Sequence, residues 1–343
     1  MEGRSLHSIL IDRRRRGFLH WMSFGVQTFG RRIPSRALLR WMLAAVCLGG
    51  CAPRSGPGRV EDSLTSGRIL VVCSADARDL IARERDAFRA LYPQADVELR
   101  EGTSRQAVGA LFAAQCDLAV LTRELLPEER AAATRGKLEL EGYTVARDAV
   151  LAMVNPANPV ENIAVQELRA VYRGEVTRWS ELGGPDRPIH VVIQPPDSDI
   201  TAFFVEAVMS GEPLAAASIY ETADSTVAAR VRSDRDAIGY VTLACPAAGC
   251  RPLRVAAMPG MRYWTPDLEA VHDGNYPLSR AVYNYVRAGG HPLANGFITY
   301  ITSRDGQQIV HEAGLVPTSV PVRFVRRSPM QSSHREEKPN PTP

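Results

Sequence analysis

Several hydroxyl and amide side chains stand where a helix is expected to begin. Ser74 follows one apolar run, Thr103 and Ser104 follow a second, and Gln194 and Ser198 precede a third helical segment. A helix N-terminus offers free N–H groups and the positive end of the helix dipole, to which hydroxyl groups add donors. The pattern therefore predicts recognition of a small anion. The alternative is that these hydroxyls only cap their helices.

A parallel sheet would bring these segments together. Apolar runs predict strands at 69–73, 96–100 and 117–121, and amphipathic segments predict helices at 76–91 and 104–115. This β-α-β-α-β order indicates an α/β fold with a parallel sheet covered by helices. In such folds the ligand lies at the carboxyl ends of the strands, where the hydroxyl segments stand.

The chain continues in the same alternation up to residue 311. The predicted strands lie at 149–155, 189–193 and 237–241, and the predicted helices at 165–173, 200–209, 223–232, 280–287, 291–303 and 305–311. Residues 319–343, rich in Pro, Ser, Arg and Glu, are predicted to be a disordered tail.

Sequence motifs of catalysis and metal binding are missing. The chain has no Gly-x-Ser-x-Gly, no His-Glu-x-x-His and no Cys-x-x-Cys, and its seven His are scattered. We therefore expect a binding protein rather than an enzyme, with no metal and no cofactor.

The charge of the chain is divided unevenly. Residues 1–50 contain nine Arg and two acidic residues, whereas residues 51–343 contain 32 basic and 36 acidic residues. A nucleic-acid partner would require clustered cations on the folded part, so this division argues against one. It favours a basic targeting segment instead.

That segment has the layout of an export signal. Four Arg at positions 31–40 precede a short apolar stretch at 41–48, and Leu48-Gly49-Gly50-Cys51 follows, which resembles a bacterial lipobox. We expect residues 1–50 to be a signal peptide whose true start is internal, for example at Met22, with the first residues a misassigned extension. Cys51 would then carry the lipid that anchors the exported protein to the membrane, facing the periplasm or the exterior, and residues 51–67 would be a tether.

Export places the remaining cysteines in an oxidising compartment. Cys245 and Cys250 flank a short turn-like segment and could form a disulfide. Cys73 ends one predicted strand and Cys116 begins another, so in parallel neighbours the two thiols would lie at opposite ends. We expect both to be small buried side chains.

The order of segments resembles the phosphate-binding periplasmic proteins of ABC transporters, which have the type 2 solute-binding fold. The resemblance covers residues 68–317, and it is carried by four segments: 162–183, 237–241, 276–280 and 303–317. It implies two α/β lobes, each with a mostly parallel sheet and with a hinge between them: lobe I from 68–147 plus 242–318, and lobe II from 148–241. We expect two separate sheets joined by crossings near 147–149 and 241–243.

The resemblance also implies ligand residues. Besides Ser74, Thr103, Ser104 and Ser198, it assigns Arg123 to the cleft. Gln194 stands where the family has an Arg, and Asp199 stands where it has a Gly. The loss of a bidentate guanidinium and the added negative charge should weaken phosphate binding.

Two functions therefore stay open. The first is an extracytoplasmic solute-binding lipoprotein that captures a small oxyanion or related polar solute for an ABC permease. The second is a sensor or envelope-interaction domain that kept the lobes and lost the phosphate site.

Overall fold

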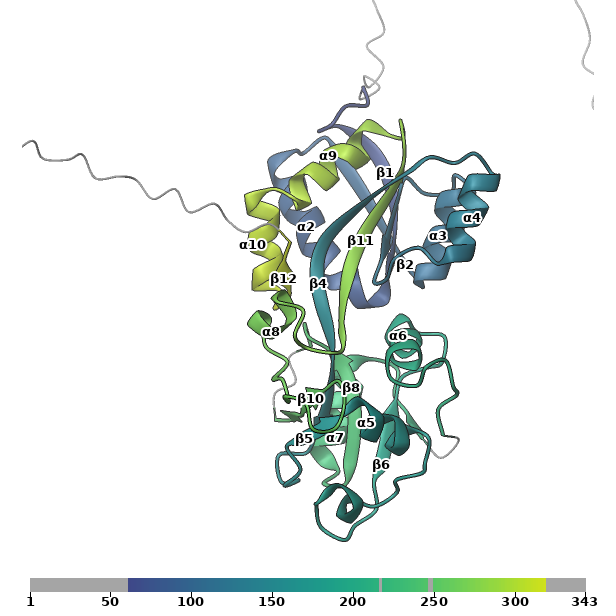
Figure 1. Cartoon of the computed structure of the whole chain (residues 1–343). Coiled ribbons are helices and arrows are strands. Elements are labelled where there is room, and N and C mark those ends of the chain that lie inside the picture. Colours follow the sequence, from purple (N-terminus) through teal and green to yellow (C-terminus); the bar gives the residue numbers. More distant parts are fainter. Residues whose placement is uncertain (1–60, 216–217, 246–248, 319–343) are drawn as a thin grey trace, which may run out of the picture. The chain divides into compact units, whose positions relative to one another are not determined.

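The computed structural model describes residues 61–215, 218–245 and 249–318, which belong to the unit Arg59–Pro343. The predicted signal peptide, Cys51 and the predicted C-terminal tail lie outside these residues. The fold contains two lobes, joined by long strands (Figure 1).

Lobe I contains a mixed sheet with the order β2-β1-β3-β11-β4. Its strands are β1 (Gly67–Ser74), β2 (Ala95–Gly102), β3 (Leu118–Leu121), β11 (Ser279–Arg287) and the first part of β4 (Leu140–Val154). The strands β1, β2 and β3 run parallel, whereas β11 runs antiparallel to both β3 and β4. The carboxyl ends of β1, β2 and β3 therefore lie at one edge, where a ligand site is expected.

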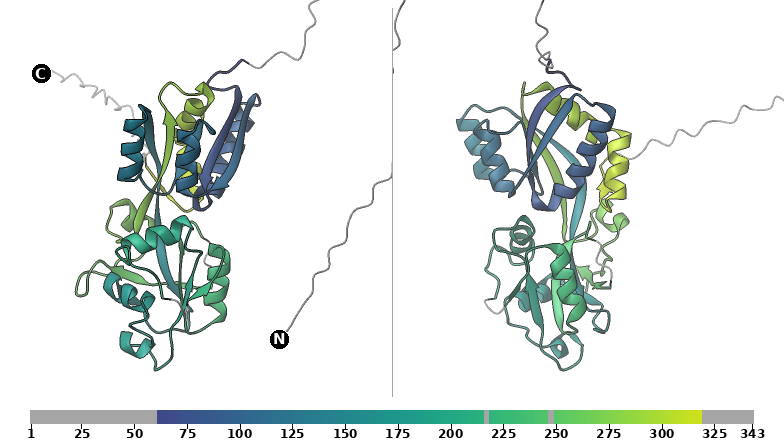
Figure 2. Two further views of the ribbon diagram at one scale, coloured as in Figure 1. Left: turned by 90° about the vertical axis from the view of Figure 1, so that its right-hand side faces the viewer. Right: turned by 180° about the vertical axis from the view of Figure 1, so that it is seen from behind.

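Helices cover both faces of this sheet. Ile69 and Val71 of β1 pack into a core with α2 (Arg78–Leu91), α9 (Pro292–Ile301) and α10 (Arg304–Glu312). Val72 points the other way, into a core with α3 (Ser104–Phe112). Figures 1 and 2 show α3 and α4 (Pro127–Arg135) on the side opposite α2 and α10. The two directions follow from the period of two of a strand.

Lobe II has its own core. Its strands are the second part of β4, β6 (His190–Ile193), β7 (Ile219–Tyr220) and β8 (Ala237–Thr242), in the order β4-β8-β6-β7. Its helices are α5 (Val165–Tyr172), α6 (Asp199–Ala207), α7 (Asp224–Ser233) and the 3₁₀ helix η2 (Trp179–Leu182). The ring centroids of the buried residues Tyr172, Phe204 and Tyr240 lie 4.3–5.7 Å apart, and these rings anchor α5 and α6 to β8.

The two lobes share one strand, where separate sheets were expected. β4 pairs with β11 up to Ala149 and with β8 from Val150 onward, so the strands form one continuous path. With 15 residues, β4 is long enough to pair first with a strand of lobe I and then with a strand of lobe II. The predicted two-lobed α/β fold is confirmed, whereas the prediction of two separate sheets was wrong.

The second crossing also differs from the expectation. After β8 the chain reaches the lobe boundary at Leu243, whose N–H donates to the Ala149 carbonyl, but it then returns to lobe II. There β9 (Arg251–Pro252) pairs with β4, β10 (Arg254–Ala256) pairs with β5 (Asn162–Ala164), and α8 (Leu268–His272) packs into the lobe II core. The chain enters lobe I at Ser279, and residues 249–278 belong to lobe II rather than to lobe I.

Residues 280–287 are a strand and not the predicted helix. Along β11 buried and half-buried residues alternate strictly, with Val282 and Val286 facing the core. β11 lies between β3 and β4, which satisfy its backbone hydrogen bonds on both sides. Helix α4 and the first part of β4 were not predicted, and β12 (Val316–Pro317) adds a short antiparallel pair to β4.

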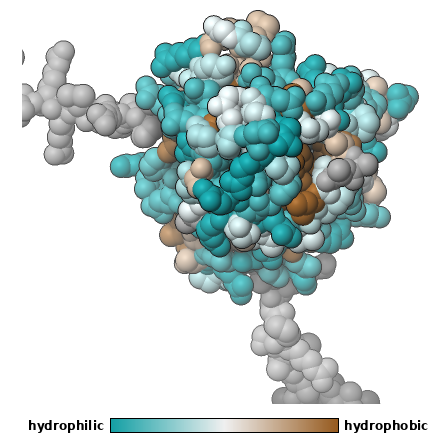
Figure 3. Space-filling model, turned by 90° about the horizontal axis from the view of Figure 1, so that it is seen from below, coloured by the Kyte–Doolittle hydropathy of each residue, from teal (hydrophilic) through white to brown (hydrophobic). Residues whose placement is uncertain are grey.

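The described residues contain no helix that is both long and apolar enough to cross a membrane. The face at the lobe II end is mostly hydrophilic, with apolar residues confined to small patches (Figure 3).

The cysteines behave partly as expected. Cys73 and Cys116 are buried at opposite ends of neighbouring parallel strands, and burial raises the pKa of each thiol to about 11. Cys245 and Cys250 are not bonded to each other in this structure, and the Cys250 thiol donates to the Ala228 carbonyl. The disulfide between them stays a prediction for an oxidising compartment.

Candidate functional site

The site begins at the end of β1. Ser74 is the last residue of this strand and precedes the 3₁₀ helix η1 (Ala75–Ala77). Its side chain is buried, and its Oγ has no hydrogen-bond partner among the described residues. A buried hydroxyl without a partner is unfavourable by about 1–3 kcal/mol, so Ser74 is a group that a ligand or water could satisfy.

The N-terminus of α3 forms the next part. Thr103 caps this helix: its Oγ1 accepts from the Gln106 N–H, and the Gln106 side chain accepts from the Thr103 N–H. The Thr103 hydroxyl therefore caps its helix, which was the alternative to ligand binding for these hydroxyl groups. Ser104, the first helical residue, is buried, and its Oγ accepts from the Thr122 N–H at 3.3 Å.

The Ser104 N–H donates across to lobe II. Its acceptors are the two carboxylate oxygens of Asp199, at 3.0 and 2.8 Å. Asp199 is the first residue of α6, and Ser198 before it is the N-cap, which accepts from the Thr201 N–H. A negative group therefore already lies against the free N–H of the α3 N-terminus, the position at which an anion is expected.

Arg123, expected as a ligand cation, makes an internal ion pair. Its Nη1 and Nη2 donate to the two carboxylate oxygens of Glu129 at 2.8 and 2.7 Å. Burial lowers the pKa of Arg123, but the hydrogen bonds and charge of Glu129 outweigh it, so the pKa is raised overall. A bidentate pair of this kind leaves little free charge for an external anion.

Gln194 is buried and donates from Nε2 to the Asp224 carboxylate. The other oxygen of Asp224 accepts from the backbone N–H and the hydroxyl of Thr242. Burial raises the pKa of Asp224, although these hydrogen bonds act in the opposite direction. The residue in the place of the family's Arg thus belongs to a network inside lobe II.

A buried arginine that the sequence analysis missed lies at the junction of the lobes. Arg280 of β11 places its Nη2 2.8 Å from both Asp76 and Asp148, and its Nε donates to Asp148. Its guanidinium carbon lies 5.7 Å from the ring centroid of Phe203 on α6. The Nη1 has no hydrogen-bond partner among the described residues. Arg280 points into the junction because of its register in β11. The sequence analysis predicted a helix at 280–287, so it could not place this side chain there.

Acidic side chains outnumber basic ones at the junction of the lobes. Burial raises the pKa of Asp76 to about 6, the charge of Arg280 lowers it, and the nearby carboxylates Asp224, Asp199 and Asp148 raise it further. The Arg280 guanidinium therefore acts on three of these carboxyl groups, those of Asp76, Asp148 and Asp224, whereas the charge of Asp199 acts on Arg123. Among the described residues, no group of three or more His, Cys, Asp or Glu is arranged to hold a metal ion.

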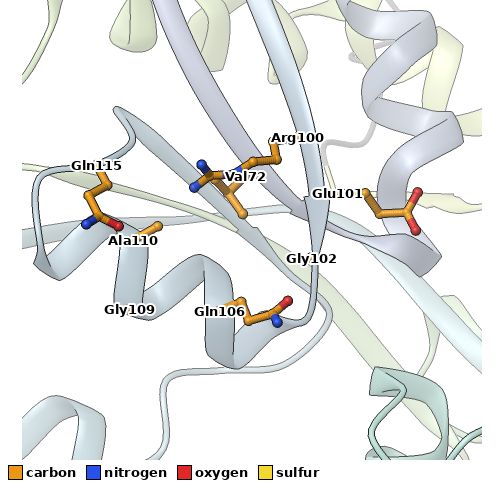
Figure 4. A pocket seen from close by; sticks show the side chains of 8 residues that line it. All are labelled: Val72, Arg100, Glu101, Gly102, Gln106, Gly109, Ala110 and Gln115. Carbon is orange, nitrogen blue, oxygen red and sulfur yellow. The ribbon is translucent and has the colours of Figure 1, made fainter. Parts of the chain in front are cut away.

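A hollow of about 470 Å³ lies elsewhere, beside β2 and α3 (Figure 4). Its wall includes Arg100 of β2, Gln106 of α3 and Gln115, which follows α3. None of the expected ligand residues lines this hollow, so the junction of the lobes is the better candidate for solute binding.

Residues 61–305 match the PBP superfamily domain. The chain belongs to this superfamily. It is also 27% identical over 282 residues to the phosphate-binding protein PstS of Bacillus subtilis, a match that covers 81% of this chain and 90% of that protein. The PstS of Pseudomonas aeruginosa is 22% identical over 278 residues, covering 76% of this chain and 86% of the relative. The chain is therefore a divergent homologue of the PstS phosphate-binding proteins.

Solved structures agree on the fold. A putative phosphate ABC transporter substrate-binding protein from Clostridium perfringens, with bound phosphate, matches with a TM-score of 0.65 and 22% identity, over 74% of this chain and 100% of that one. An ABC-type phosphate transport receptor from Vibrio cholerae matches with a TM-score of 0.64 and 20% identity, over 73% and 99%. The resemblance to phosphate-binding proteins seen in the sequence is confirmed.

Some of the expected ligand residues lie close to one another, whereas others cap helices or bind carboxylates of the protein itself. Ser104 and the α6 N-terminus meet directly through Asp199, whereas Thr103 and Ser198 cap helices. Arg123 and Gln194 are held by carboxylates. The assignment of these residues to a ligand stays a prediction.

Proposed function

We propose that this protein is an extracytoplasmic solute-binding component that captures a small oxyanion or related polar solute between its lobes. The observation that supports this most is the Ser104 N–H at the start of α3, which faces the other lobe and already binds a carboxylate. Its PstS homologues are named for binding phosphate. A partner permease would receive the solute, and a lipid on Cys51 would hold the protein at the membrane.

A second function is favoured by one observation. The donor that would bind the solute is occupied by Asp199 of the protein itself, and Arg123 is paired with Glu129. A domain of this kind could close and present a surface without transporting a solute, as a sensor or envelope-interaction protein would.

A thermal-shift panel distinguishes the two. A solute that binds only the folded state raises the melting temperature by mass action. Phosphate, sulfate, carboxylates and neutral polar solutes should be compared at equal ionic strength. A saturable rise for one class supports solute capture, whereas no rise for any of them would favour the second function.

A further inference from the structure

We infer that Asp199 is a built-in occupant of the anion position, which holds the lobes together without a solute and competes with any external oxyanion. Only the competition with an external oxyanion rests on the proposed function, because the contact between the lobes forms without a solute.

The Asp199 carboxylate lies directly at the N-terminus of α3. Both carboxylate oxygens of Asp199 lie within 3.0 Å of the Ser104 backbone nitrogen. Thr103 and Gln106 satisfy each other through the capping box, whereas the Ser104 N–H points out of the helix to another element. A charged acceptor at a helix N-terminus makes a stronger hydrogen bond than a neutral one.

The hydrogen bond between Ser104 and Asp199 connects the two lobes. Asp199 begins α6 in lobe II, and Ser104 begins α3 in lobe I. The side chain therefore spans the junction as a solute would, but it is attached to the chain. An attached group has a high effective concentration, so an external anion must displace it before it can reach the same N–H.

A residue in the same loop provides a matched control. Asp197 lies two positions earlier and is exposed, and it makes no hydrogen bond or ion pair with the residues that the structure describes. Asp197→Ala removes the same atoms and the same charge as Asp199→Ala but leaves the contact with Ser104. A difference between the two variants therefore reports the contact rather than the net charge.

The donor can also be removed without touching Asp199. Ser104 is the first residue of α3, a position that tolerates Pro, and Thr103 already has the extended backbone that precedes a Pro. Ser104→Pro deletes the N–H together with the Oγ, whereas Ser104→Ala deletes only the Oγ. Comparing these two variants isolates the N–H.

The experiment combines small-angle scattering of the solute-free protein with isothermal titration of inorganic phosphate at fixed salt. Asp199→Ala and Ser104→Pro should enlarge the radius of gyration, because the lobes separate, whereas Asp197→Ala and Ser104→Ala should not. Asp199→Ala keeps the N–H and should bind phosphate about 10- to 100-fold more tightly than the unmodified protein, the range expected when a charged competitor is removed.

Different results separate this inference from the proposed function. An enlarged radius in Asp199→Ala and Ser104→Pro with no phosphate binding in any variant supports the internal contact and speaks against phosphate capture. An unchanged radius in both, or measurable phosphate binding with equal affinity in Asp199→Ala and Asp197→Ala, would overturn the inference. Ser104→Pro is compared only if it unfolds cooperatively, and Asp199→Ala decides the question without it.

Discussion

Arg280 and Asp148 are paired directly across β11 and β4, just before β4 changes its partner strand from β11 to β8. The Arg280 Nε donates to Asp148 Oδ2 at 2.8 Å, while Asp148 Oδ1 accepts from the N–H groups of Ala149 and Leu243. The strand that enters lobe I, the strand that leaves it and the turn after β8 thus meet at one carboxylate. The junction of the lobes is polar and buried, so it depends on the pairing of its charges.

Replacing Arg280 should therefore destabilise the fold strongly. Arg280→Met leaves Asp76 and Asp148 buried without their cation, and breaking such a pair costs about 3–5 kcal/mol. Urea unfolding at pH 7 measures the change. The control is Arg68→Met, which breaks the exposed pair with Glu98 and should have little effect. A loss for Arg280→Met no larger than that of the control would contradict this account.

Glu84 should make the protein less stable as the pH rises. This α2 residue is buried with both carboxylate oxygens unpaired among the described residues, and burial raises its pKa to about 9. The folded state keeps the proton that the unfolded chain releases near pH 4.5, so the stability that depends on neutral Glu84 is fully present below pH 4.5 and falls up to about pH 9.

Glu84→Gln should remove this dependence. The neutral amide has a similar shape and does not ionise, so the variant should gain on the order of 1.4 kcal/mol over the unmodified protein for each pH unit between these limits. Thermal unfolding from about pH 5 to about pH 9 measures it. Glu206→Gln, at an exposed position on α6, serves as the control and should follow the unmodified protein. Parallel pH profiles for Glu84→Gln and the unmodified protein would show that the carboxyl group is solvated.

Inorganic phosphate should bind weakly or not at all to the unmodified protein. Gln194 provides no positive charge and is held by Asp224, and Asp199 occupies the α3 N-terminus. The double change Gln194→Arg with Asp199→Gly should strengthen binding by about one to two powers of ten beyond the removal of the Asp199 carboxylate alone, because the new guanidinium adds one charged hydrogen bond. Isothermal titration at fixed salt measures both proteins. Tight binding by the unmodified protein would mean that other cations complete the site.

The single change Gln194→Arg should achieve less than the double change. The new guanidinium would meet the Asp224 carboxylate that now accepts from Gln194, and Asp199 would still occupy the α3 N-terminus. The same titration, run on the single variant, measures the difference. Equal affinities of the single and double variants would show that Asp199 does not oppose the anion.

Lipid should be attached at Cys51. The residue follows Leu48-Gly49-Gly50 behind a basic flank. Labelled fatty acid should be incorporated by the unmodified precursor and by Cys47→Ala, but not by Cys51→Ala. Label on Cys51→Ala would refute the assignment.

The first half of lobe I could be predicted from the sequence because its signals are local. The apolar runs around Val71 and Val120 and the amphipathic helix around Phe88 are complete within short windows, and α2 and α3 separate these strands along the chain. The family resemblance rested on the order of such segments, and the comparisons confirmed it. The hydroxyl segments were also placed at one edge by this reasoning, although their use as caps could not be distinguished from ligand binding.

The tertiary structure decided the features that depend on distant partners. Residues 280–287 become a strand because β3 and β4, which lie far earlier in the chain, supply hydrogen bonds on both sides. For the same reason residues 249–278 join lobe II, since β5 and β4 pair with β10 and β9.

The polar contacts at the junction depend on even more distant groups. Ser104 and Asp199 are 95 positions apart in the chain, and Asp148 and Arg280 are 132 positions apart. A local sequence pattern cannot reveal such pairs, because their free energy arises only once the lobes have folded and brought the charged groups out of water.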